Sequence, residues 1–352
     1  MTDFIIVGRG LAANVLMHTF QQHQLSFHTF GNEQLSNCSR IAAGIWNPVV
    51  FKRLTRSWLA DEIIPCLNQF YFDCESTLGK AVVTKRPIIK PFVEEQEKRL
   101  WKKKSITELN GFLDPEIYTH LPPELNHFKI TNGFGLVNQC GNLNTGEFIS
   151  LSNIAFNHNI TTETFDHSLL KIFPDKVVYK NREARHIVFC EGYLVKHNPF
   201  FNWVPLKPAK GEVLTIRSEQ LKLTNSIFNK NGFLMDLGAG SYKLGATYEW
   251  TELTENTTQK GREELELKLH QMIGCDYSVI DHQAGVRPSS IDRRPIIGRH
   301  PNYQNLHIFN GLGTKGVMLA PFFAKNFVNF YLQKERLVTD VQINRFYKLY
   351  GG

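Results

Sequence analysis

The sequence lacks any apolar run approaching the roughly 18 residues that a membrane-spanning helix requires. It also lacks a basic leader with a cleavage site, because the chain enters the apolar run Phe4–Val7 almost directly. These absences exclude a helical membrane span and a secretory signal peptide. We therefore expect a cytoplasmic protein.

Cysteine is scarce and scattered. No two cysteines form a CxxC pair, and no spacing of cysteine and histidine matches a metal ligand set. We interpret all six as free thiols and expect no metal site. They are Cys38, Cys66, Cys74, Cys140, Cys190 and Cys275.

The composition is that of a globular protein, with 42% hydrophobic and 21% charged residues, which excludes disorder, collagen and coiled coil. The 352 residues exceed one typical domain, so about two cores are expected. The chain has 40 Lys and Arg residues and 33 Asp and Glu residues, so its formal net charge is 40 − 33 = +7. This excess fits a phosphate-bearing cofactor, acidic substrates or weak nucleic-acid attraction, and charge alone does not choose between them.

A glycine-rich turn near the amino terminus is the first sign of function. Phe4–Val7 is typical of a buried parallel strand, and the GxGxxA pattern of Gly8, Gly10 and Ala13 follows it. Helical spacing and a second strand over 25–30 then predict a βαβ unit. Gly8 would make the tight turn, Gly10 would let the backbone approach a pyrophosphate, and Ala13 would allow close helix packing. The pattern favours dinucleotide binding over a turn without a ligand.

The ribose-binding position departs from this pattern. An acidic residue is expected roughly 20 residues after the turn, at the end of the second strand. The chain has Gly31 and Asn32 there, and Glu33 is the nearest substitute. Glu33 is interpreted either as a ribose ligand or as a solvated turn residue.

Two further segments near the amino terminus are candidates for cofactor contact. Ser39–Pro48 combines a hydroxyl, a cation and small residues, as suits a loop that approaches a flat ligand, and Arg40 could pair with a phosphate. The basic residues Lys52, Arg53 and Arg56 follow. They are interpreted equally well as phosphate contacts or as the solvated start of a helix.

The middle of the chain predicts a second, antiparallel region. His186–Cys190 is another buried strand, and its end at Glu191–Gly192 is of the kind that abuts a nucleotide. A strand over 213–216 and a hairpin with its turn at 238–241 follow. A helix over Arg262–Ile273 would pack on the resulting sheet.

The carboxyl-terminal region contains a second glycine-rich turn between a strand and a helix. The strand is predicted at Leu306–Phe309, and Gly311–Gly316 opens a helix with Pro321 in its first turn. The amide donors and dipole of this turn suit an electron-rich ring on which negative charge develops.

Together these motifs resemble the D-amino-acid oxidase and glycine oxidase family of flavoenzymes, over nearly the whole chain. The motifs are Gly8–Asn14, Ser39–Pro48, Pro205–Glu212, Leu244–Glu249, Gly285–Gly298 and Gly311–Pro321. The resemblance implies a mixed α/β (α+β) fold, in which an antiparallel-sheet substrate domain is inserted into a Rossmann-like FAD-binding domain. The implied boundaries are 1–80, 144–204 and 281–352 for the FAD domain, and 81–143 and 205–280 for the substrate domain.

The same resemblance assigns roles to residues. FAD is expected to bind noncovalently, because Gly311–Gly316 contains neither cysteine nor histidine for a covalent link. The implied cofactor contacts are Gly8, Gly10, Ala13, Glu33, Ser39, Arg40, Ala43, Gly44, Gly192, Gly311, Gly313, Thr314, Lys315 and Gly316.

Arg287 and Lys315 are the candidate catalytic residues. Arg287 matches the arginine that pairs with the substrate carboxylate in glycine oxidase, although a structural ion pair is the alternative. Glycine oxidase-like proteins have an arginine where this chain has Thr314. The neighbouring Lys315 is expected either to lie over the flavin, holding charge or assisting oxygen reduction, or to be solvated.

The implied activity is FAD-dependent oxidation of the C–N bond in a small amino acid or secondary amine. A hydride passes to flavin N5, water hydrolyses the imine, and oxygen or another acceptor takes the electrons. Tyr242, Tyr248 and Trp250 are candidate walls of the substrate pocket, with burial in a core as the alternative.

Two other functions stay open. A flavin domain acting on a carboxymethylamino-modified tRNA base would use the cluster Lys98–Lys104, in which Trp101 is interleaved with cations. The mixed charges around this cluster favour a solvated face, so nucleic acid is not the expected partner. A flavin-binding protein without turnover is the other alternative.

Overall fold

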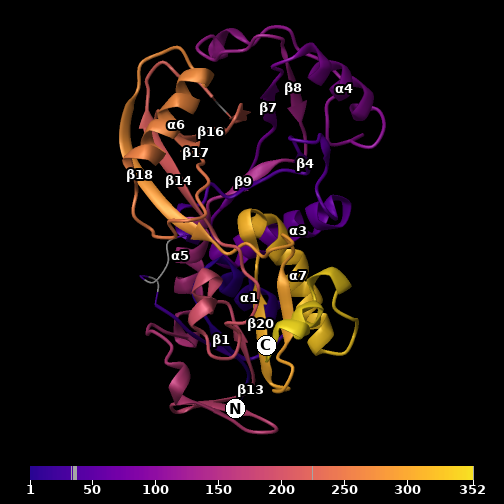
Figure 1. Ribbon diagram of the computed structural model, residues 1–352, viewed down its shortest axis with the longest axis vertical. Helices are drawn as coiled ribbons and strands as arrows, with labels where there is room; N and C mark the ends of the chain where they lie inside the picture. The colour runs from indigo at the N-terminus through magenta and orange to yellow at the C-terminus, as the bar shows by residue number, and fades with distance from the viewer. Residues whose placement is uncertain (33, 35–37, 224, 352) are drawn as a thin grey trace.

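The computed structural model describes residues 1–32, 34, 38–223 and 225–351, so that Glu33 lies outside the described residues. Two large sheets, with helices around them, organise the molecule, one in the lower and one in the upper half of Figure 1. This is the mixed α/β architecture that the sequence predicted. No helix in the described ranges has the length and apolar character needed to cross a membrane.

The lower sheet has eight strands among the described residues and contains the predicted βαβ unit. β1 (Thr2–Val7) pairs in parallel with β2 (Phe27–Phe30), and α1 (Leu11–Gln22) connects them. β1 also pairs in parallel with β13 (Arg182–Phe189), which pairs in turn with β20 (Leu306–Asn310). The other strands are β10 (Ile160–Thr161), β11 (Leu170–Ile172), β12 (Val177–Tyr179) and β19 (Ile296–Arg299).

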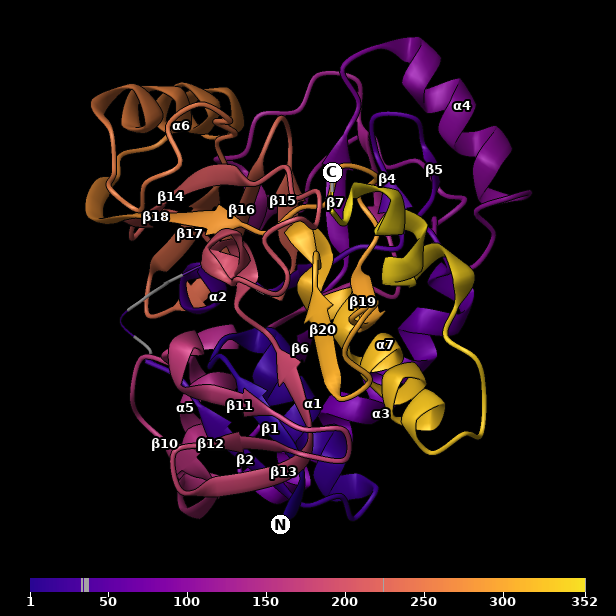
Figure 2. The same ribbon diagram turned by 60° about the horizontal axis from the view of Figure 1, so that its bottom comes forward.

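Helices cover this sheet and align the two glycine turns. α7 (Gly316–Tyr331) contacts both α1 and α3 (Ala60–Leu78), as Figure 2 shows for α7 and α3 beside β20. The parallel strands β1, β13 and β20 all end at the same edge of the sheet. The turns that follow β1 and β20 therefore lie near each other, although about 300 residues separate them.

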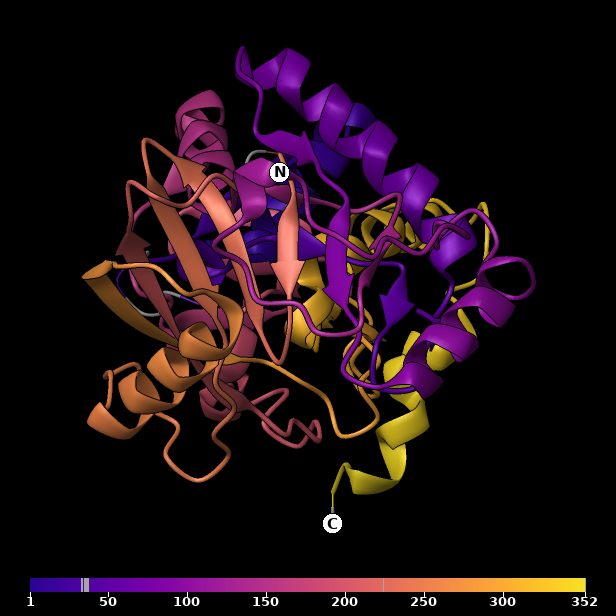
Figure 3. The ribbon, with the colours of Figure 1, turned by 90° about the horizontal axis from the view of Figure 1, so that it is seen from above.

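The upper sheet has seven strands in the described part of the chain and joins two distant segments. β7 (Ile88–Pro91) pairs in parallel with β15 (Ile227–Asn229), so strands of the first half of the chain lie beside orange ones in Figure 3. The other strands are β8 (Phe134–Val137), β14 (Ala209–Arg217), β16 (Phe233–Gly238), β17 (Ser241–Gly245) and β18 (Ser278–Arg287).

One face of the upper sheet is a hydrophobic core, and the other faces the lower half. Leu214, Leu234 and Leu244 are fully buried, and their cluster includes Leu265 and Leu269 of α6 (Gln259–Met272). The predicted hairpin is confirmed as β16 and β17, and α6 confirms the predicted helix with a start three residues earlier. β18 begins at Ser278 and so crosses the predicted domain boundary at 281, and the boundaries stay a prediction.

Further elements complete the fold. They are α2 (Cys38–Ile41), α4 (Glu95–Ser105), α5 (Thr145–Ala155), β3 (Ile45–Trp46), β4 (Val49–Val50), β5 (Thr55–Arg56), β6 (Val83–Lys85) and β9 (Gly141–Leu143). Among them, α4 lies at the outer edge of the upper half in Figure 1, and α5 contacts α1 in the lower half. β3 pairs with β9, and β9 pairs with β6. The Ser39–Pro48 segment is thereby anchored between the sheets.

Pro321 is the sixth residue of α7 and lies in its second turn, not in the predicted first turn. Proline has no N–H, so the carbonyl four residues earlier, that of Val317, loses its helical donor. The Tyr71 hydroxyl of α3 donates to that carbonyl at 3.1 Å. This side-chain hydrogen bond explains how a buried helix accommodates proline at that position.

Candidate functional site

The turn after β1 brings the backbone close to the end of β13. Gly8 has φ +122°, and a Cβ on it would lie 2.5 Å from the Cys190 carbonyl oxygen. Gly10 is the N-cap of α1 and makes no side-chain cap hydrogen bond. The first turn of α1 therefore presents N–H groups and a positive dipole end to a ligand. Ala13, an implied cofactor contact, is fully buried in the core and does not line the cavity.

The Ser39–Gly44 segment lies against this turn. The Ser39 hydroxyl accepts a hydrogen bond from Leu11 N–H at 3.1 Å, and Arg40 donates to Ser150 Oγ at 3.2 Å. Gly44 has φ +67°, and a Cβ on it would lie 1.9 Å from the Leu143 carbonyl oxygen. Only glycine allows the chain to pass β9 so closely. All the predicted contacts of this segment line the cavity, namely Ser39, Arg40, Ala43 and Gly44.

The end of β13 and the turn after β20 are held together by one side chain. Asn310 donates from Nδ2 to the Gly192 carbonyl oxygen at 2.9 Å and accepts from the Gly311 N–H at 2.8 Å. Gly192 and Gly313 line the cavity, whereas Gly311 lies behind it, with φ +73°. Asn310 was missed by the sequence reasoning, although an asparagine between a buried strand and a glycine turn is a recognisable signal.

Lys315 lines the cavity together with Thr314 and Gly316. Its Nζ donates to the Ser57 hydroxyl at 2.8 Å. Burial, with a smaller effect of the Arg294 charge, lowers the pKa of Lys315 to about 8. The ammonium is therefore a ready proton donor near neutral pH, and the bond to Ser57 fixes its position.

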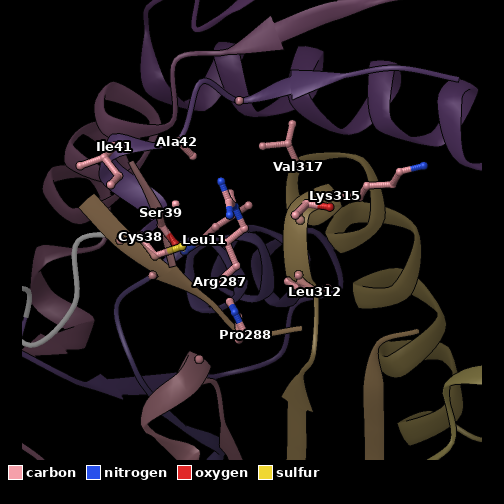
Figure 4. Close-up of a pocket in the computed structure, with 18 of the residues that line it drawn as sticks. Leu11, Cys38, Ser39, Ile41, Ala42, Arg287, Pro288, Leu312, Lys315 and Val317 are labelled. Atoms are coloured by element: carbon pink, nitrogen blue, oxygen red, sulfur yellow. The ribbon is translucent and has the colours of Figure 1, made fainter. Parts of the chain in front are cut away.

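Arg287, at the end of β18, lies in the middle of the pocket, between Cys38 and Leu312 in Figure 4. Its guanidinium lies over the Tyr248 ring, with Cζ 4.4 Å from the ring centroid. Nη1 donates to the carbonyls of Lys210 and Thr247, and Nη2 donates to Thr247, all at 3.3 Å. Guanidinium has five N–H donors, so Nε–H and one Nη2–H have no partner among the described residues. These two donors form the parallel fork that a carboxylate accepts.

A single cavity of about 1380 Å³ joins these features. Pockets for drug-sized ligands have volumes of about 300–1,000 Å³, so this cavity is larger than a usual single-ligand pocket. It extends from Gly8 and Gly10 past Arg287 to the upper sheet at Lys90 and Phe233. Lys90 was missed by the sequence reasoning, since one lysine after two isoleucines gives no local signal.

The three aromatic residues that were candidate walls of the substrate pocket have different surroundings. Tyr242 is buried in the core of the upper sheet, and its hydroxyl donates to the Leu221 carbonyl, so the core alternative holds for it. Tyr248 is 51% exposed and lines the cavity, and Trp250 stacks on it with ring centroids 6.0 Å apart. Trp250 itself does not line the cavity.

The basic segments have different surroundings. Lys52 lines the cavity, whereas Arg56 pairs with Asp61 at 2.5 Å. In α4, Trp101 is 1% exposed and donates to the Asp114 carbonyl at 2.9 Å, so its ring is not available for base stacking. All six cysteines are free thiols, and the described residues contain no cluster that could hold a metal ion.

Comparison with known proteins agrees with this geometry. Residues 154–329 match the family of FAD dependent oxidoreductases named DAO. The glycine oxidase of Bacillus licheniformis is 31% identical over 145 residues, which are 40% of this chain and 39% of that protein. The tRNA 5-methylaminomethyl-2-thiouridine biosynthesis bifunctional protein MnmC of Legionella pneumophila (strain Corby) is 25% identical over 174 residues, 41% of this chain and 26% of that protein. The chain thus matches about two fifths of the glycine oxidase's length.

Solved structures match over nearly the whole chain. The glycine oxidase of Geobacillus kaustophilus has a TM-score of 0.80 at 17% identity, covering 95% of both chains. The iminodiacetate oxidase of Chelativorans sp. BNC1 has a TM-score of 0.78 at 14% identity, covering 95% of this chain and 96% of that one. At these identities the likeness shows the fold, and it confirms the predicted mixed α/β fold.

Proposed function

The chain belongs to the DAO family of FAD-dependent oxidoreductases, and on this premise we propose that it oxidises the C–N bond of a small amino acid or secondary amine. One observation carries the proposal. A single cavity is lined by both glycine turns and by Arg287, whose Nε–H and one Nη2–H have no partner within the described part of the chain. The six free thiols support the expected reducing, cytoplasmic compartment.

The residues present fit FAD. Gly10 has no side chain to cap α1, so the N–H groups of the first turn beyond Leu11, whose N–H Ser39 accepts, would be available to a pyrophosphate. Gly8 would let the chain turn closely past Cys190 at this helix end. Arg40, beside Ser39 on the cavity wall, would add a cation there. Gly313 and Gly316 would place backbone N–H groups against the ring system. Bound FAD supplies the two-electron acceptor for the reaction.

The side chains of this protein position and prepare the substrate. Arg287 binds the carboxylate through its Nε–H and Nη2–H, while Tyr248 supports the other side of the guanidinium. This bond orients the α-hydrogen of the substrate and leaves its neutral amine directed into the cavity. The C–N bond becomes an imine as a hydride leaves the α-carbon, and water then releases the ketone or aldehyde and the amine. Oxygen or another acceptor takes the two electrons.

Lys315, in the second glycine turn, has a different role from Arg287. Its lowered pKa lets Nζ exist in both protonation states near pH 8, held by Ser57. The protonated form stabilises negative charge that develops on the cavity side during electron transfer. Thr314 replaces the arginine of glycine oxidase-like proteins, so Arg287 is the carboxylate anchor and glycine itself is not the assigned substrate.

Removal of the guanidinium tests this function. The yellow holoprotein is mixed anaerobically with amino acids and N-alkyl glycines, and bleaching of the flavin absorbance is followed. We expect bleaching by at least one of these amines, and Arg287→Ala lowers kcat/KM for carboxylate substrates about a hundredfold, because a charge-assisted bidentate bond is lost. Arg287→Lys recovers part of the loss. An unchanged KM for every carboxylate substrate in Arg287→Ala contradicts the role, and failure of every amine to bleach the flavin favours a binding protein without turnover.

A modified tRNA base is the second candidate substrate, and the match to the Legionella protein favours it. The buried ring of Trp101 weighs against α4 as the contact surface. Binding of tRNA by the protein that weakens steeply with rising salt concentration would support this candidate. Absence of retention at low salt would exclude it.

A further inference from the structure

The cavity continues beyond Arg287 along one face of the upper sheet. Four lining residues on neighbouring strands form one cross-strand row, in the order Val213, Gly245, Phe233 and Asn229. β7 extends this row, because Phe228 pairs with Ile89 and the next residues along both strands are Asn229 and Lys90. Lys90 therefore stands at the outer end of the row and lines the cavity.

Lys90 is a half-buried cation without a carboxylate partner. Its Nζ donates to the Pro91 carbonyl at 2.9 Å and lies 5.9 Å from the centroid of the Phe51 ring. None of the described residues forms an ion pair with it. Burial lowers the pKa of Lys90, the Glu97 charge partly offsets this effect, and the Lys230 charge adds to it. Glu97 also lines the cavity, and its carboxylate accepts a hydrogen bond from Val93 N–H at 2.6 Å.

A second lysine follows the ring that Lys90 contacts and lines the same cavity. Lys52 follows Phe51 in the turn between β4 and β5, lines the cavity, and makes no ion pair within the described chain. Lys268, which lines the same cavity, is different, because Glu264 pairs with it at 2.8 Å. The outer end thus has the half-buried Lys90 and the exposed Lys52, neither of which forms an ion pair among the described residues, near the apolar rings of Phe51 and Phe233.

Such an arrangement is costly without a ligand. Partial burial of the Lys90 ammonium without an ion pair is unfavourable, and the second cation at this end of the cavity adds to the attraction for an anion, although Glu97 also lines the cavity. The strand order places β18 and β7 five steps apart, which is roughly 20–25 Å along the sheet. One carboxylate cannot bridge Arg287 and Lys90, but an extended molecule with an anion at each end can.

We propose that the amine substrate carries a second anionic group, a carboxylate or a phosphate, at the far end of an apolar linker, and that Lys90 and Lys52 bind this group while Arg287 binds the carboxylate beside the reacting carbon. The inference rests on the proposed function and names the substrate class of that site.

The test compares molecules that differ only in the remote charge. The oxidisable pair is N-(9-carboxynonyl)glycine and its methyl ester at the remote carboxylate, with N-(9-phosphonononyl)glycine to separate carboxylate from phosphate recognition. The inert pair is (9-carboxynonylthio)acetate and its remote methyl ester, whose binding to the holoprotein is read from the change in flavin absorbance. We expect the doubly charged member of each pair to be favoured at least tenfold, in kcat/KM or in Kd.

The variants assign that preference to residues. Lys90→Met combined with Lys52→Met removes the preference and leaves the esters unchanged, whereas Lys90→Arg retains it. Lys103→Met, an exposed lysine of α4, is the matched control and retains it fully. Equal affinity of ester and dianion in the natural protein, or equal losses for both in the double variant, overturns the proposal.

The two levels of the account fail separately. Lys90-dependent binding of the inert dianion without bleaching by any amine contradicts the proposed function and keeps the anion site. Bleaching by N-alkyl glycines without preference for the dianion supports the proposed function and contradicts the anion site. Competition by tRNA that is lost in the double variant assigns the outer end to a polynucleotide and overturns the small-molecule proposal.

Discussion

At the scale of single residues, the site depends on glycines at positions where a side chain cannot fit. Gly8 and Gly44 combine positive φ with a backbone carbonyl within 2.5 Å of the Cβ position. Backbone carbonyl oxygens in a packed interior cannot move aside as the end of a flexible side chain does. These two glycines are therefore required for close backbone approach as well as for turn geometry.

Gly8→Ala is expected to abolish or strongly weaken FAD uptake, because the methyl group pushes β1 and β13 apart where the pyrophosphate binds. The flavin-to-protein absorbance ratio of the purified protein measures this. Gly79→Ala is the matched control, since Gly79 has φ +67° with no atom within 4 Å of its Cβ position. The control loses about 1–2 kcal/mol of stability and keeps its flavin. Equal flavin loss in both variants would show that backbone strain alone is responsible.

Lys315→Met is expected to change how stability depends on pH. The pKa of Lys315 is lowered in the folded protein to about 8, so between about pH 8 and its ordinary value the unfolded chain binds more protons and stability rises with pH. Below pH 8 the buried charge costs up to about 3 kcal/mol. The methionine variant of the apoprotein should therefore gain more stability at pH 7 than at pH 10.

Urea unfolding of the apoprotein at both pH values measures this gain. Lys103→Met, which removes an exposed charge, serves as the control. The same difference between variant and natural protein at both pH values would contradict the assigned burial of the ammonium.

At the scale of elements, α3 compensates for a proline in α7. The Tyr71 hydroxyl occupies the place of the N–H that Pro321 lacks at the Val317 carbonyl. The bond ties α3 to the first turn of the helix that follows the second glycine turn. An element far from the cofactor in sequence thereby fixes the backbone that faces it.

A double-mutant cycle tests this compensation. Tyr71→Phe should cost about 1–3 kcal/mol, since it leaves a buried carbonyl unpaired. In the Pro321→Ala background the helix supplies its own N–H, so the same substitution should cost less by about 1 kcal/mol. Chemical denaturation of the four proteins measures the coupling. Strict additivity would show that the hydroxyl does not replace the missing donor.

At the scale of the whole molecule, the sequence predicted what local patterns encode. Both glycine turns, the βαβ unit, the hairpin and α6 depend on residues that are neighbours in sequence. Asn310 and Lys90 were not predicted, because their partners come from β13 and from the turn after β4. The burial of Trp101 and Tyr242 was also hidden, since it depends on how α4 and the upper sheet pack.

The arrangement of the two sheets makes the cavity a product of the whole chain. Its lining takes residues from both turns, from the Ser39–Gly44 segment and from strands at both ends of the upper sheet. One cavity thus reaches from the amino end of α1, where we propose that the pyrophosphate binds, to the cations at Lys52 and Lys90. This continuity is the reason why cofactor and substrate can be assigned to one site.

Titration of the flavin-free protein with FAD tests the central claim most directly. The account predicts saturation at one equivalent of FAD per chain, with a perturbed flavin spectrum. It also predicts much weaker binding of riboflavin, which has no pyrophosphate to place at the amino end of α1. A colourless protein that takes up no FAD, or that binds riboflavin as tightly as FAD, would contradict the account.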